Sequence, residues 1–298
     1  MASAPAPSVA RARAAGLATA VYRRRKAVDA LMRGGCVAAT LLALVPLGSV
    51  LYWVASRGAA GLGVSFFTEL PAPVGELGGG MGQAFAGTVL LIGLAGLVGI
   101  PCGVLAGVYL AEFGEGRFAR LVRFSADVLA GVPSITVGVF VYTLVVLSMR
   151  RFSALAGGIA LGILMLPTVT RTTDELLRLV PDALREAALA LGVPKWRAIT
   201  RVVLRTAAPG IATGVMLAVA RVAGETAPLL FTAFGNRFWS VTLDRPIGSL
   251  PVQIYTYAVS PYEDWHQQAW TAALVLVLLV LVLNVGARLL VRGRVPAR

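Results

Sequence analysis

Residues 184–210 read LREAALALGVPKWRAITRVVLRTAAPG and lead directly into the apolar segment IATGVMLAVARVAGETAPLLFTA, residues 211–233. The first stretch is rich in Ala, Leu, Arg and Glu, a composition that favours helices over flexible coil. The second stretch is apolar enough to cross a membrane, yet it carries Arg221 and Glu225. A folded polar loop that leads into a charged membrane helix is therefore the feature that decides the fold.

The composition excludes a soluble globule, because 57% of the 298 residues are hydrophobic and only 14% are charged. A helix needs about 20 residues to cross a hydrocarbon core of about 30 Å. Windows of about that length lie near 36–57, 84–111, 125–148, 153–172, 209–234 and 268–292. None shows the two-residue alternation of a barrel wall. We therefore predict an all-α polytopic membrane protein with about six transmembrane helices.

The basic residues predict which side of the membrane each segment occupies. Most of the 27 Lys and Arg residues fall in the two terminal tails and in the 112–124 and 171–205 loops. Because cytoplasmic segments carry the positive excess, both termini are expected in the cytoplasm. The predicted segments are a basic cytoplasmic tail (1–35), a first transmembrane helix with an external loop (36–83), a membrane core (84–292) containing a cytoplasmic loop at about 174–208, and a cytoplasmic tail (293–298).

The cytoplasmic loop is predicted to be a helical hairpin. Pro181 and Asp182 can start a short helix that runs to about Leu191. Gly192 then suits a left-handed position at the end of that helix, and Pro194 bars its continuation. A second helix is expected to begin near Lys195, so the chain turns sharply at 192–194.

The residues of this hairpin resemble the EAA loop of ABC importer permeases. Glu186, Ala187 and Ala188 are followed, after three residues, by Gly192, although the family's usual final Leu-Pro appears as Leu204-Arg205. The resemblance implies a type I ABC importer permease fold, in which this loop docks on an ATP-binding subunit. The chain has no Walker A sequence, so it is expected to be no enzyme, to hold no cofactor or metal, and to leave ATP hydrolysis to partners. The alternative is an ordinary amphipathic cytoplasmic hairpin.

Arg221 and Glu225 are candidates for a transport path. At 1.5 Å per residue, Arg221 would lie about 18 Å into a helix that starts near Pro209, with Glu225 one turn later on the same face. Ionisable residues at such depth normally face a bundle interior or a water-filled path. The alternative is an internal ion pair that fixes helix packing. Gly224 and Pro228 predict a local bend beside the pair.

The end of the fourth window places the hydroxyl group of Thr170 beside Arg171, among further threonines. A guanidinium group can donate two parallel hydrogen bonds to an oxyanion, and hydroxyl groups add further donors. Thr170 and Arg171 are therefore candidates for the inner mouth of the path. The alternative for Arg171 is an anchor at the cytoplasmic membrane interface.

Five further runs together resemble the PstA family of permeases from phosphate-specific ABC importers. They are GVPSI (131–135), LPTVTRTTDELLRLVPD (166–182), REAALALG (185–192), GETAPLLFTA (224–233) and SLPVQIYTY (249–257). The resemblance implies a bacterial inner-membrane subunit that carries inorganic phosphate by alternating access. It also implies a sister permease PstC, two copies of the ATP-binding subunit PstB and an external binding protein PstS. The alternatives are a permease for another oxyanion such as sulfate or molybdate, and a proton-coupled secondary carrier.

Overall fold

The computed structural model describes residues 7–76 and 78–292, and it is helical throughout the described residues apart from turns and loops. Two compact units are distinguished, Met1–Ala55 and Ser56–Arg298. The first unit is formed by helix α1 (Pro7–Gly58), which continues into the start of the second. Helix α1 thus runs through most of the segment that was predicted as a basic tail. The remainder of that segment and the predicted tail at 293–298 lie outside the described residues.

Five helical segments among the described residues are long and apolar enough to cross a membrane. They are Tyr22–Gly61, Gly82–Glu112, Ala154–Arg178, Lys195–Ala223 and Glu263–Leu289. They correspond to α1 with η1 (Ala59–Gly61), α3 (Gly82–Glu112), α7 (Ala154–Arg178), the continuous run α9–η3–α10, and α13 (Glu263–Arg292). The prediction of an all-α polytopic membrane protein is therefore confirmed.

The third predicted span is not one helix. Helix α4 (Gly116–Gly131) and the segment Ser134–Met149, made of α5 (Ser134–Val141), the π-helical turn η2 (Tyr142–Val146) and α6 (Leu147–Met149), meet at an angle of 105°. Pro133 causes the break, because proline forces the preceding Val132 into an extended conformation, here with ψ 131°. The window predicted near 125–148 is therefore a bent pair of helices and not one continuous helix, and counting that pair as one span gives six candidate spans among the described residues.

Glycine residues bring α3 and α7 into close contact. Gly99, Gly103 and Gly107 recur every four residues on the face of α3 that meets α7. A Cβ atom at Gly103 would lie 2.7 Å from the Cβ atom of Val169, and one at Gly107 would lie 2.5 Å from that of Thr173. Small residues at such spacing let two membrane helices approach backbone to backbone.

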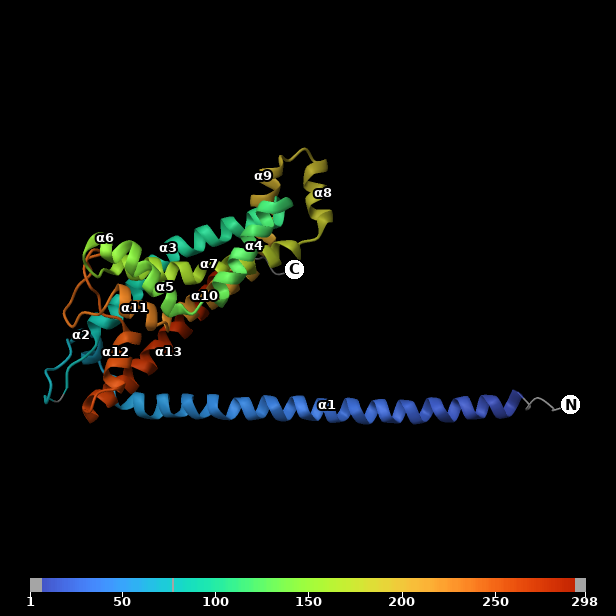
Figure 1. Cartoon of the computed structure of the whole chain (residues 1–298), viewed down its shortest axis with the longest axis horizontal. Coiled ribbons are helices and arrows are strands. Elements are labelled where there is room, and N and C mark those ends of the chain that lie inside the picture. Colours follow the sequence, from blue (N-terminus) through green and yellow to red (C-terminus); the bar gives the residue numbers. More distant parts are fainter. Residues whose placement is uncertain (1–6, 77, 293–298) are drawn as a thin grey trace. The chain divides into compact units, whose positions relative to one another are not determined.

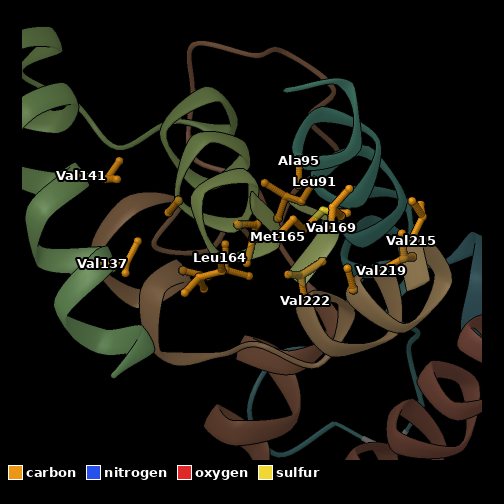
Figure 2. Packing of buried hydrophobic residues seen from close by; sticks show 14 of the residues in the cluster. Leu91, Ala95, Val137, Val141, Leu164, Met165, Val169, Val215, Val219 and Val222 are labelled. Atoms are coloured by element: carbon orange, nitrogen blue, oxygen red, sulfur yellow. The ribbon is translucent and has the colours of Figure 1, made fainter. Parts of the chain in front are cut away.

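The core of the second unit lies where α10 (Leu204–Ala223) packs against this helix pair. Figure 2 shows side chains from α3, α5, α7 and α10 gathered in one cluster. The labelled members on α3, α7 and α10 are Leu91, Ala95, Leu164, Met165, Val169, Val215, Val219 and Val222. They carry no charge, so the charged side chains of these helices lie on other faces.

The shorter elements gather at the two ends of the second unit. They are α2 (Val64–Thr68), α8 (Asp182–Ala190), α9 (Lys195–Ala198), the π-helical turn η3 (Ile199–Val203), α11 (Ala227–Thr232) and α12 (Leu250–Ala258). Helices α8 and α9 lie at one end, called here the α8 end, and α12 lies toward the other, called the α12 end (Figure 1).

Candidate functional site

The predicted hairpin is present at the α8 end. Helix α8 ends at Ala190, and Gly192 has the left-handed φ of 73° that favours glycine. The Gly192 N–H donates to the carbonyl oxygen of Leu189 at 2.9 Å, and the Val193 N–H donates to that of Ala188 at 3.1 Å. Such bonds satisfy carbonyl groups that a helix end leaves without partners. Pro194 precedes α9, so the predicted turn at 192–194 is confirmed.

The residues of the EAA-like motif lie on different faces of α8. Glu186 and Ala187 are exposed, whereas Ala188 is 7% exposed and packs inward. Leu189 and Leu191, in the same hairpin, are apolar side chains that are 50% and 83% exposed. A polar loop that presents apolar side chains beside an exposed carboxylate can bind the surface of another protein.

Thr170 and Arg171 line a cavity of about 140 Å³ between α3, α4 and α7, near the α8 end. Thr170 is buried, whereas Arg171 is exposed and already paired. The guanidinium group of Arg171 bonds Asp127 of α4 at 2.9 Å and Glu175 at 3.1 Å. The structure therefore brings together the two residues predicted for the inner mouth, and it adds Asp127 as a partner from α4.

A second ion pair joins the same two helices. Arg123 of α4 donates to Asp174 of α7 at 3.0 Å, and Arg178 donates to the other oxygen of that carboxylate at 2.7 Å. The charged groups of this cluster are Arg123, Arg171, Arg178, Asp127, Asp174 and Glu175. Positive and negative charges balance, so in this conformation the cluster links α4 to α7. Arg171 has to leave Asp127 before it can offer its full charge to an anion.

Arg221 and Glu225 do not share one helix. Helix α10 ends at Ala223, Gly224 caps it, and the N–H of Glu225 bonds the carbonyl oxygen of Val222 at 3.2 Å. Glu225 thus lies in the break before α11, and Pro228 has no N–H with which to continue the preceding helix. The predicted placement on one helix face is wrong, whereas the predicted bend is confirmed. Among the described residues no ion pair joins the two side chains.

Arg221 is exposed on this chain and lies closer to the α12 end than to the α8 end. Its neighbours Val222 and Ala223 line a small cavity with Leu91 of α3. Along α3, Leu91 lies about 14 Å from Gly82, at the α12 end, and about 32 Å from Glu112, at the α8 end. The continuous helix begins at Lys195 and not near Pro209, so Arg221 lies farther from the start of its helix than predicted. Its mid-membrane depth stays a prediction.

The fold of this chain is similar to that of known transporter subunits. Residues 99–295 match the family of binding-protein-dependent transport system inner membrane components. A chain of the MetNI methionine ABC transporter, in inward-facing crystal forms, superposes with a TM-score of 0.55 at 20% identity, over 71% of this chain and 92% of that one. A chain of an amino acid ABC transporter superposes with a TM-score of 0.54 at 18% sequence identity, over 70% of this chain and 92% of that one. The family match over residues 99–295 thus defines the chain as a membrane component of a binding-protein-dependent transport system.

Relatives over nearly the whole chain narrow the class. The phosphate transport system permease protein PstA of Yersinia pestis is 48% identical over 90% of this chain and 91% of its own. The PstA protein of Xylella fastidiosa strain Temecula1 is 46% identical over 93% of this chain and 97% of its own. PstA 1 of Mycobacterium tuberculosis strain H37Rv is 41% identical over 84% of this chain and 83% of its own. The chain belongs to the PstA family of phosphate transport system permease proteins.

Proposed function

We propose that this chain is the permease subunit of an ATP-driven importer of inorganic phosphate in the bacterial inner membrane, with both termini in the cytoplasm. The observation that carries the proposal is the similarity to phosphate permeases over about nine tenths of the chain, together with the ordered hairpin. The partners are the sister permease PstC, two copies of the ATP-binding subunit PstB, and the binding protein PstS. ATP is hydrolysed by the ATP-binding partner subunits and not by this chain.

The hairpin receives the movement of the ATP-binding subunit. Glu186 and Ala187 lie on the exposed face of α8, where a partner can contact them, and Ala188 holds the opposite face against the bundle. Gly192, with its left-handed backbone, sets the turn at the edge of the docking surface. When the partner closes on ATP, the hairpin moves with it and the helices rock between outward-open and inward-open forms.

The phosphate path lies between this chain and the sister permease. Arg221 is a charged, exposed residue in an apolar span, and a charge in that position is costly unless it faces water or another subunit. It attracts the anion from the α12 end. Glu225, in the break between α10 and α11, limits how tightly the anion is held, because a carboxylate repels phosphate.

Arg171 and Thr170 serve at the α8 end of the path. In this conformation Asp127 and Glu175 neutralise Arg171. A movement of α4 away from α7 breaks the Arg171–Asp127 pair and frees one side of the guanidinium group for phosphate. Arg171 therefore binds the anion only when the helices rearrange, as alternating access requires.

The experiment is uptake of radiolabelled phosphate by vesicles that contain the complex purified with this chain. Uptake should require ATP and survive a protonophore. Excess unlabelled phosphate should compete, whereas excess sulfate or molybdate should not. Competition by sulfate or molybdate would favour a permease for another oxyanion. Uptake that is driven by a proton gradient without ATP would favour a secondary carrier.

A further inference from the structure

Arg185 holds three helix ends together beneath the hairpin. Its Nε and Nη2 atoms donate to Oε1 of Glu112, the last residue of α3, at 3.1 and 2.9 Å. Its Nη2 and Nη1 atoms also donate to the carbonyl oxygens of Leu177 and Val180, at the end of α7, at 2.8 and 2.6 Å. Nη1 reaches Asp182, in the first turn of α8, at 3.0 Å. One guanidinium group thus joins α3, α7 and α8.

The Glu112–Arg185 pair is more enclosed than the other ion pairs of the described residues. The Glu112 side chain is 6% exposed and that of Arg185 is 20% exposed. The Arg171–Asp127 pair, by comparison, is 61% and 56% exposed. A charge-assisted pair that is shielded from water and shares further hydrogen bonds is stronger and stiffer than a surface pair. Its two partners therefore move as one.

The second arm of the hairpin also contacts the end of α3. The ammonium group of Lys195, the first residue of α9, donates to the carbonyl oxygen of Glu112 at 3.3 Å. It also lies 4.4 Å from the ring centroid of Phe113, the residue that follows α3. Arg185 and Lys195 flank the turn at 192–194, so both arms of the hairpin are attached to the end of α3.

We propose that Glu112 and Arg185 form the positioning link that carries movement of the hairpin into the membrane helices. Arg185 faces into the bundle from α8, next to the exposed Glu186. Force on the outer face of α8 therefore reaches α3 through Glu112 and α7 through the two carbonyl oxygens. The closely packed pair α3 and α7 then transmits it across the membrane. The inference rests on the proposed coupling to an ATP-binding subunit.

The experiment measures phosphate taken up per ATP hydrolysed by the purified complex in vesicles. Glu112→Ala removes the link and leaves Arg185 its bonds to the carbonyl oxygens of α7. The ratio should fall about fivefold or more, the lower range of coupling between distant sites. Glu112→Gln keeps the shape and a neutral acceptor, so its ratio should lie between that of Glu112→Ala and wild type. Glu115→Ala is the matched control, an exposed carboxylate three residues away, and should leave the ratio unchanged.

Two results would overturn the proposed link. One is a wild-type ratio in both Glu112 variants while the ATP-binding subunits stay bound. The other is loss of those subunits from both variants, because the pair would then serve assembly and not transmission. Absence of phosphate uptake by the wild-type complex would refute the proposed function itself. Measuring the wild-type vesicles first therefore distinguishes a failure of the proposed function from a failure of the proposed link.

Discussion

Replacing Gly103 with alanine should destabilise the contact between α3 and α7. The added Cβ atom would lie 2.7 Å from Cβ and 2.8 Å from Cγ1 of Val169. Carbon atoms in contact prefer about 3.5–4.0 Å, so the two helices have to separate by about 1 Å along this seam. Inserting one methyl group into a packed core of this kind costs about 1–3 kcal/mol.

Gly93 provides the matched control on the same helix, because a Cβ atom there would meet nothing within 4 Å. Both substitutions gain the same helix propensity, about 1 kcal/mol, which cancels when the two variants are compared. Gly103→Ala should therefore be less stable than Gly93→Ala by about 1–3 kcal/mol. For a chain of this size the Tm difference is about 2–5 °C.

The assay is thermal unfolding of the purified chain in detergent, with both variants measured beside wild type. Gly93→Ala should unfold at or slightly above the wild-type temperature, and Gly103→Ala below it. Equal unfolding temperatures for the two variants would show that the close approach of the helices at Gly103 places no restriction on a side chain, contrary to this prediction.

Two further changes test the hairpin and the inner cluster. Gly192→Val places a β-branched residue at a φ of 73°, which costs about 1–2 kcal/mol of strain. The ATP-binding subunit should then no longer co-purify with the chain. Retained subunits with unchanged stimulated ATPase activity would contradict the docking role. Asp127→Asn frees one side of the Arg171 guanidinium group and should tighten phosphate binding to the complex, measured by titration calorimetry. The free energy of unfolding should change by only about 0–1 kcal/mol, because both side chains are largely exposed. Asp244→Asn, which breaks the similarly exposed pair with Arg151, is its control, and equal phosphate affinity in the two variants would refute a role for Arg171.

The hairpin was predictable because local chemistry sets it. A glycine that tolerates a left-handed backbone and a proline two residues later leave the chain few conformations, and the structure has the turn where they predict it. The membrane character was equally predictable, since hydropathy acts over whole segments and does not depend on which helices pack together.

The two broken segments were only partly predictable. Pro133 and Gly224 are visible signals, but apolar windows continue on both sides of each, and hydropathy alone joins them into single spans. The 105° bend after α4 and the end of α10 at Ala223 depend on what the neighbouring helices leave room for. Gly138, for example, approaches Pro228 so closely that an added Cβ atom would lie 2.6 Å from its Cα atom.

Partners across helices could not be predicted at all. Asp127 and Arg171 are 44 residues apart, and Glu112 and Arg185 are 73 apart. The sequence shows that each charged residue lies near a helix end. Which opposite charge it pairs with depends on how the helices pack, and the sequence does not show that. The sequence proposes Glu186 and Gly192 as docking residues, whereas it shows Arg185 only as a neighbour of the motif.

We propose that phosphate crosses the membrane along a path to which Arg221 contributes. ATP-driven phosphate uptake by vesicles tests this with Arg221→Gln, beside Arg201→Gln, an exposed arginine near the α8 end, as control. Arg221→Gln should abolish uptake while the complex stays assembled, and Arg201→Gln should transport as wild type does. Uptake at the wild-type rate by Arg221→Gln would contradict this proposal.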